Sequence, residues 1–336
     1  MQTTTPECML SRLAWQVTLA ITSLTVISLQ IVGLRFHGHM TPEIIALTTA
    51  LVCLVVYYRC IRQDHGIASM VISVGQLVVV MVMGIMLTYV ASTVPLPYRD
   101  FELYAIDRWL GFQREAYLDF LRRNDGLRAV LGFAYDSLLP QSIFVLLASA
   151  AVRRIDRLQG YVIAFAIAIT ATALIAIFVP AANAAIYLDK MPTDVSILPD
   201  GRHSYFPTLE GLRAGTLRII NFNAMDGLIS FPSFHTANAI LIVWTLWPIS
   251  FLRMVLLPLN LLLIASTPLC GAHYVIDIVG GAAVAFAAIV VTSRLARSPR
   301  GHASRSPVAQ EPEATSALRT ENDRSIATGT QGLQPG

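Results

Sequence analysis

Charge is scarce in this sequence. Only 13% of the 336 residues are charged, whereas 55% are hydrophobic, and the mean hydropathy is +0.60. A soluble globular domain carries about 25% charged residues, so the composition indicates a membrane protein. The net charge of +3 is small, and no basic run is long enough to follow a phosphate backbone. Nucleic acid is therefore excluded as an expected partner.

Cysteine is equally sparse. The spacings of Cys8, Cys53, Cys60 and Cys270 match no zinc or redox motif. Cys53 and Cys270 fall inside apolar stretches, where a cysteine usually behaves as a small hydrophobic residue. We therefore expect no disulfide framework and no cysteine-bound metal.

Long apolar segments make up most of the chain. A spanning helix needs roughly 17–25 mostly apolar residues, and the sequence predicts eight spans, of which the sixth and seventh are short. The first is longer than the ~7–15 apolar residues of a cleavable signal, so we expect it to be retained. The fold class is an all-α, polytopic membrane helix bundle. The predicted spans are Leu13–Leu34, Pro42–Tyr58, Ala68–Val94, Ala129–Val152, Gly160–Val179, Thr236–Phe251, Met254–Leu269 and Tyr274–Leu295.

The connections differ in character. Pro95–Arg128 is amphipathic and carries Trp and Tyr, which suits helices lying in the membrane interface. Pro180–Leu228 is too polar to span and too long for a simple turn, and loops of this length are often functional. The tail from residue 298 to 336 is polar and is predicted to be disordered. We therefore divide the chain into N-terminal transmembrane helices (1–94), a membrane core with interfacial helices and an outer loop (95–297), which holds the candidate catalytic residues described next, and the tail (298–336).

Basic residues in short loops predict the orientation, since these loops usually stay in the cytoplasm. With eight spans, both termini lie on one side. We predict that this side is cytoplasmic, with the two long connections and the turn near residues 270–273 outside. The basic residues on the cytoplasmic side are Arg12, Arg59, Arg62, Arg153, Arg154, Arg157, Arg253, Arg294, Arg297 and Arg300.

His235 stands where the long polar loop enters an apolar helix. Pro232 and Ser233 before it can start that helix, because Pro suits a first turn and Ser suits a cap. The free backbone N–H groups of a helix start favour an anion, and a histidine can donate or accept a proton near neutral pH. The alternative is a capped helix with an interfacial histidine.

His273 and Asp277 are four positions apart and so share one face of a helix. Asp277 falls about one turn into the eighth span, where an ionisable group is costly and usually paired. A carboxylate bound to one ring nitrogen fixes the tautomer and leaves the other nitrogen basic, as a nucleophile or general base requires. The alternative is a structural pair closing a helix end. Because two spans separate His235 from His273, we expect both at the same membrane face.

Arginines in the loop before the sixth span could bind phosphate, because a guanidinium holds phosphate oxygens in a bidentate fork. Arg213 and Arg218 lie closest in sequence to His235, and Arg202 lies further away. The alternative for each arginine is a contact with the headgroups of membrane lipids. Asp136 and Gln141, near the end of the fourth span, could line a cavity or join helices by a hydrogen bond.

Two of these patterns match a known family. Pro232-Ser233-Phe234-His235 resembles the second motif, PSxH, of the type 2 phosphatidic acid phosphatase superfamily, and His273-x-x-x-Asp277 resembles its third motif, HxxxD. The separation of 38 positions between the two histidines suits the two-helix spacing of that family.

Within the superfamily, the sequence looks most like the inositolphosphotransferase branch, which includes inositol phosphorylceramide synthases and bacterial relatives. The similarity lies in the run Gly227–His235 and in Gly280-Gly281, and the stretch Ala105–Phe112 also resembles bacterial members. The resemblance to bacterial members implies a bacterial inner membrane. We expect the glycine pair to permit close helix packing.

The resemblance implies a mechanism without a metal or another cofactor. His273 would attack phosphorus and form a phosphohistidine, Asp277 would orient it, and His235 would protonate the departing alcohol. Ser233, Arg213 and Arg218 would bind the substrate. The resemblance also implies a six-helix core, with two of the eight spans added at the N-terminus.

The sequence departs from the family pattern at two places. There is no KxxxxxxRP first motif, and the arginine that usually precedes the third-motif histidine is replaced by Thr267. The phosphate-binding cations must therefore come from elsewhere.

The expected function is that of a lipid phosphatase or headgroup phosphotransferase acting on a membrane lipid phosphate or phosphodiester. Water as acceptor gives the phosphatase and another alcohol gives the transferase. The alternative is a non-catalytic, degenerate member or a transporter of the same fold. Transporters usually contain repeats and polar sites at the bilayer midplane, and neither is found here. Vanadate-dependent enzymes share this type of site but are typically soluble.

Overall fold

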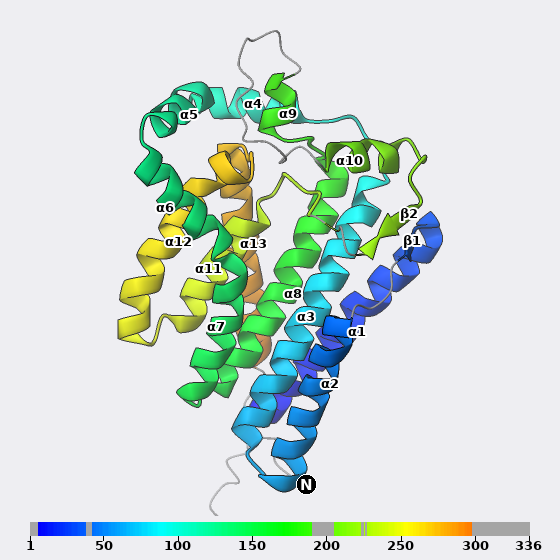
Figure 1. Ribbon diagram of the computed structural model, residues 1–336, viewed down its shortest axis with the longest axis vertical. Coiled ribbons are helices and arrows are strands. Elements are labelled where there is room, and N and C mark those ends of the chain that lie inside the picture. Colours follow the sequence, from blue (N-terminus) through cyan, green and yellow to red (C-terminus); the bar gives the residue numbers. More distant parts are fainter. Residues whose placement is uncertain (1–5, 38–41, 190–204, 223–224, 226, 298–336) are drawn as a thin grey trace, which may run out of the picture. The chain divides into compact units, whose positions relative to one another are not determined.

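The computed structural model describes residues 6–37, 42–189, 205–222, 225 and 227–297 (Figure 1). Arg202 and the predicted disordered tail lie outside these residues. The elements, in chain order, are α1 (Pro6–Val32), β1 (Arg35–His37), α2 (Pro42–Val56), the π-helical turn η1 (Tyr57–Ile61), α3 (His65–Ser92), α4 (Asp100–Trp109), α5 (Arg114–Arg122), α6 (Asp125–Asp136), α7 (Leu138–Ala151), α8 (Ile155–Phe178), α9 (Ala184–Asp189), α10 (Phe206–Arg213), β2 (Ile219–Asn221), α11 (Phe234–Leu246), α12 (Ser250–Cys270) and α13 (Val275–Ala296).

All eight apolar segments fold as helices, which confirms the all-α membrane bundle. In the described part of the chain, five helices are long and apolar enough to cross a membrane, namely α1, α3, α8, α12 and α13. The segment 48–61 and α11 are shorter apolar helices. The structure therefore supports five or six spans by length, and the predicted number of eight stays a prediction.

The predicted fourth span is bent into α6 and α7, which meet at an angle of 52° around Ser137. Pro140 explains the break. In a continuous helix its ring would clash with the carbonyl of Asp136, and it has no N–H to donate. In the first turn of a new helix, that missing N–H costs nothing.

Helix α8 lies at the centre of the bundle, where it packs against α3, α1, α13 and α11 (Figure 1). It is apolar on all sides, and its buried residues include Tyr161, Phe165 and Ile169, as expected of a helix surrounded by other helices. The Tyr161 hydroxyl donates to Asn238 Oδ1 at 2.8 Å, and Asn238 Nδ2 donates to Ser142 Oγ at 2.9 Å. This chain of hydrogen bonds joins α8, α11 and α7.

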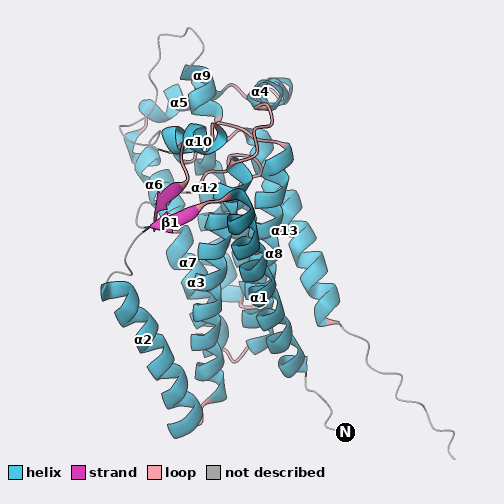
Figure 2. Ribbon diagram, turned by 90° about the vertical axis from the view of Figure 1, so that its right-hand side faces the viewer, coloured by secondary structure: helices cyan, strands magenta, loops and turns pink. Residues whose placement is uncertain are grey.

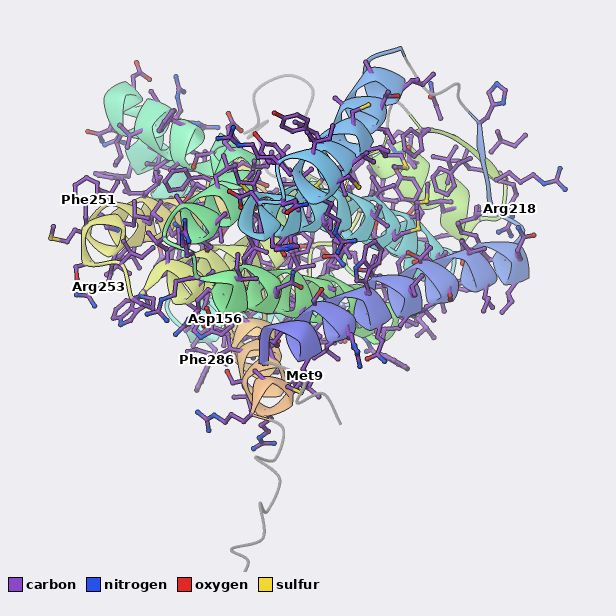
Figure 3. The ribbon with its side chains drawn as sticks, turned by 90° about the horizontal axis from the view of Figure 1, so that it is seen from below. Met9, Asp156, Arg218, Phe251, Arg253 and Phe286 are labelled. Carbon is purple, nitrogen blue, oxygen red and sulfur yellow. The ribbon has the colours of Figure 1, made fainter. Side chains whose placement is uncertain are left out.

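The connections separate into two groups at opposite ends of the bundle. Helices α4, α5, α9 and α10 lie at the upper end in Figure 1, whereas the α7–α8 and α11–α12 connections lie at the lower end. Figure 3, seen from below, shows Asp156 and Arg253 of that lower end. The amphipathic segment therefore forms the predicted helices at one end, opposite these two short connections. Which end faces the cytoplasm stays a prediction.

The only strands in the described residues are β1 and β2, a short parallel pair in which Arg35 is in register with Ile219. They join the end of α1 to the segment that leads towards α11. Figure 2 shows this pair at the side of the helices, with α2 standing apart from the bundle except where it approaches α3.

Gly281 brings α13 against the loop that starts α11. A Cβ atom at this position would lie 2.2 Å from the backbone oxygen of Ser233, and one at Gly280 would lie 2.9 Å from the Phe231 ring. The Ser233 N–H donates to the Asp277 carbonyl at 3.0 Å. The glycine pair therefore serves close packing, as expected, and fixes the His235 segment on the helix that begins next to His273.

We predict that Gly281→Ala destabilises the protein by about 1–3 kcal/mol, the usual cost of overpacking, because the backbone of Ser233 would have to move. Thermal unfolding in detergent measures this change. The matched control is Gly75→Ala on α3, where a new Cβ meets no atom within 4 Å. There alanine should leave the stability unchanged or raise it, since it favours a helix over glycine by about 1 kcal/mol. Equal melting temperatures for both variants would contradict the prediction.

Candidate active site

Asp277 and His273 form a buried pair at the start of α13. His273 Nδ1 lies 3.0 Å from Asp277 Oδ2, and the two side chains are 5% and 0% exposed. The same Oδ2 atom accepts from Ser230 Oγ at 2.8 Å and from the Tyr274 N–H at 3.1 Å. A carboxylate beside Nδ1 favours the tautomer with the proton on that nitrogen, so Nε2 keeps its lone pair. The ring is thus fixed in the form that a nucleophile needs.

The turn that carries His273 is folded back onto α12. The Thr267 carbonyl accepts from the Gly271 N–H at 2.9 Å and from the His273 N–H at 3.3 Å. Ala272 between them has a left-handed backbone, with φ of 53°, a conformation uncommon outside glycine. Its carbonyl is bound by the Ala184 N–H of α9 at 3.0 Å. Thr267, which replaces the arginine of the family motif, therefore acts through its backbone in shaping this turn.

Gly271 leaves space for two rings. A Cβ atom there would lie 2.6 Å from His273 Cδ2 and 2.9 Å from the Tyr135 hydroxyl. Any larger residue would push the histidine or the tyrosine away. Tyr135 also stacks on His235, with ring centroids 4.4 Å apart and planes inclined by 15°. Tyr135 of α6 thus lies against both histidine-bearing segments.

The structure brings His235 and His273 together, with ring centroids 6.2 Å apart. Both line one cavity of about 510 Å³. Its polar part also includes Ser230, Asn183 and Tyr205. Two imidazoles that face one cavity from separate segments can act on opposite sides of one bound group. The described lining of the cavity contains no Lys or Arg.

Three buried charged residues of α4 and α5 hold the turn from outside. Asp107 accepts from the first two N–H groups of α13, those of Val275 and Ile276, at 2.8 and 2.9 Å. Asp100 accepts from the N–H groups of Ala182 and Asn183 at 2.9 and 3.1 Å.

The Tyr274 hydroxyl also donates to Asp100, at 2.8 Å. Arg114 Nη1 donates to the His273 carbonyl at 3.2 Å. Burial raises the pKa of Asp100 and of Asp107 and lowers the pKa of Arg114. The bound N–H groups oppose the shift at both aspartates.

Sequence reasoning missed these three residues. Asp100, Asp107 and Arg114 are spaced by seven positions, and each is about 5% exposed or less. Asp100 and Asp107 are two helical turns apart in α4 and so lie on one side of it. That spacing was an available signal for the two aspartates, whereas Arg114 starts a separate helix and no helical spacing links it to them.

The predicted substrate-binding residues lie elsewhere. Ser233 is fully buried and caps α11, accepting from the Thr236 N–H. Arg213 donates to the carbonyls of Val94 and Leu96 and lies over the Tyr98 ring, with its guanidinium carbon 4.0 Å from the centroid.

Arg218 donates to the Val32 carbonyl at 3.0 Å and lies at the periphery in Figure 3. None of Ser233, Arg213 and Arg218 lines the cavity described above, so their roles in substrate binding stay predictions.

Gln141 joins helices. It donates to Ser137 Oγ at 2.8 Å and accepts from Asn260 Nδ2 of α12 at 2.7 Å. Asp136 is exposed. Neither side chain lines the cavity, so of the two interpretations the structure favours helix packing for Gln141.

Comparison with known proteins gives one match. The sequence model of the PAP2 superfamily matches residues 101–291, from α4 into α13. This range includes both histidines, Asp277, Asp107 and Arg114, whereas Asp100 immediately precedes it. No curated protein and no solved structure matches the chain.

We predict that Asp107→Ala destabilises the protein by about 0.5–2 kcal/mol, the usual cost of losing a helix cap, because two N–H groups of α13 lose their acceptor. Thermal unfolding in detergent measures the loss. The control is Asp119→Ala on α5, which removes an exposed pair with Arg122 and should change stability by about 0–1 kcal/mol. A control that loses as much stability as Asp107→Ala would show that the cap has no special role.

Proposed function

The chain belongs to the PAP2 superfamily, and from this membership and the geometry of the site we propose that it is a membrane enzyme that transfers the phosphoryl group of a lipid phosphate or phosphodiester through a phosphohistidine on His273. Members of the superfamily are phosphatases that act on lipid phosphates. One observation carries the proposal. His273, with Nδ1 bound to Asp277, faces His235 across a single cavity.

The proposed first step is attack of His273 Nε2 on phosphorus. The N–P bond forms while the bond from phosphorus to the alcohol oxygen breaks. His235 takes up a proton from the bound phosphate monoanion and donates it to that alcohol oxygen. Asp277 stabilises the positive charge that the His273 ring gains. The alcohol, which for a lipid phosphate monoester carries the hydrocarbon part, then leaves.

In the second step His235, now neutral, removes a proton from an acceptor, whose oxygen attacks the phosphohistidine. The N–P bond breaks and His273 returns to its starting form. A lipid phosphate monoester leaves a phosphoryl group on His273, and water as acceptor then releases inorganic phosphate. A phosphodiester donor leaves its headgroup phosphate on His273, and an alcohol as acceptor then gives a new phosphodiester. The run Gly227–His235 resembles the inositolphosphotransferase branch, which supports the transferase reaction as the second candidate. Comparing the lipids of cells with and without the gene separates the two, since an accumulating lipid phosphate indicates a phosphatase and a missing headgroup lipid a transferase.

Positive charge near the site is supplied by Arg114. It is buried behind the His273 carbonyl and close enough to interact electrostatically with Asp277, and its Nη2 atom has no hydrogen-bond partner in the described part of the chain. We propose that Arg114 lowers the free energy of the negatively charged phosphoryl group at His273 through its charge. We also propose that the site opens on the outer face, as the basic connections at the opposite end suggest.

We predict that His273→Ala abolishes phosphate release from a diacylglycerol phosphate in detergent micelles, because no other group can accept the phosphoryl. The control is His65→Ala at the first residue of α3, at the opposite end of the bundle, which should retain wild-type turnover. Full activity of His273→Ala would eliminate the mechanism.

We predict that the effect of His235→Ala depends on the leaving group. An alkyl alcohol needs a proton to depart, so turnover of a diacylglycerol phosphate should fall by about 10²–10⁴-fold, the usual contribution of general acid catalysis. Nitrophenolate leaves without protonation, so with p-nitrophenyl phosphate the rate of the step that forms the phosphohistidine should fall much less. Burst kinetics of nitrophenol release measure that step. Equal losses for both substrates would refute the role of His235 as the acid.

A further inference from the structure

The cavity at the histidines continues into the interior of the bundle as an apolar chamber. Besides the polar residues named above, its lining comes mainly from α3, α7, α8 and α11. It is mostly apolar but includes the polar side chains of Thr88, Ser142, Thr172 and Asn238. The apolar side chains include Leu77, Met81 and Ile85 of α3, Leu138 of α7, and Phe165 and Ile169 of α8. One cavity is therefore lined both by the two imidazole rings and by hydrocarbon side chains.

Helix α3 supplies one wall of this chamber through a regular pattern. Leu77, Met81 and Ile85 are spaced by four positions, so they lie on one face of the helix. The helix is held close to α8 at Gly84, where an added Cβ would lie 2.3 Å from Ile169. Helix α3 also precedes the segment that matches the family model, which begins at residue 101. The wall is therefore built by a part of the chain outside the matched region.

The chemistry of the chamber selects its occupant. An ordered water needs two to four polar partners. Three of the polar side chains in this wall, those of Thr88, Ser142 and Asn238, already donate to other protein groups, which leaves few partners for water. A cavity of about 510 Å³ falls within the roughly 300–1,000 Å³ of typical ligand pockets, which are mostly apolar with a few polar groups. An alkyl chain fits these walls, and each methylene it buries contributes roughly a fourfold gain in affinity.

We propose that this chamber binds the hydrocarbon segment of the substrate that adjoins the reacting phosphate, and that Leu77, Met81 and Ile85 of α3 determine which chains are accepted. This inference rests on the proposed function, because the phosphate must lie between His235 and His273. The lipid is thereby held partly inside the protein, with its phosphate at the histidines.

Narrowing the chamber at Met81 tests the proposal. For Met81→Trp we expect kcat/KM for dioleoyl phosphatidic acid in micelles to fall at least tenfold. The kcat/KM for p-nitrophenyl phosphate, which has no alkyl chain, should fall less than twofold. The matched control is Val79→Trp on the same helix, since Val79 is 40% exposed and does not line the cavity. Val79→Trp should leave kcat/KM unchanged for both substrates. Equal effects of Met81→Trp on the two substrates, or no effect on either, would overturn the proposal.

A second measurement does not depend on how Met81→Trp folds. A phosphatidic acid that carries a diazirine in the first half of one acyl chain is bound to the His273→Ala variant. The complex is irradiated, the protein is digested, and the labelled peptides are identified. Label on residues 77–88 and on 165–172 supports the chamber, and label confined to other helices overturns it. If the wild type hydrolyses neither probe, the proposed enzymatic function is wrong, and crosslinking alone then decides whether the chamber binds a lipid chain.

Discussion

The site depends on the carboxylate of Asp277. One oxygen accepts from His273, Ser230 and the Tyr274 N–H, and the backbone carbonyl of the same residue accepts from the Ser233 N–H. Asp277 therefore joins the segment that leads to His235 with the turn that carries His273. A fully buried carboxylate is stable only when such donors replace water. The group that orients the His273 ring thus also holds the two histidine segments in one arrangement.

The interfacial helices extend this arrangement outwards. Asp100, Asp107 and Arg114 bind backbone groups of three segments, namely the start of α13, the 182–183 segment and the His273 turn. These segments lie at the ends of helices, where backbone groups lack partners within the helix. Charged side chains satisfy them with strong hydrogen bonds, and this accounts for buried charge in a chain with little charge overall. The helices of the amphipathic segment therefore hold the backbone segments that surround the site.

Much of the site could be predicted from the sequence, because its parts are local. His273 and Asp277 are one helical turn apart, and an ionisable group in an apolar segment needs a partner, so their pairing followed from spacing alone. The common face of His235 and His273 followed from counting spans. The position of the arginines could not be predicted in this way. Arg213 and Arg218 are near His235 in sequence, but Arg213 binds the loop carbonyl of Val94 and Arg218 binds the carbonyl of Val32 at the end of α1.

The sequence by itself determined the membrane bundle, the His–Asp pair and the gathering of polar segments at one end, since these follow from hydropathy and helical periodicity. Only the tertiary structure decided which distant residues complete the site. Asp107 and Arg114 reach the His273 turn across more than 150 positions of chain, and α3 closes the apolar chamber from outside the matched region. Packing between helices sets such contacts, and no local pattern encodes which faces meet.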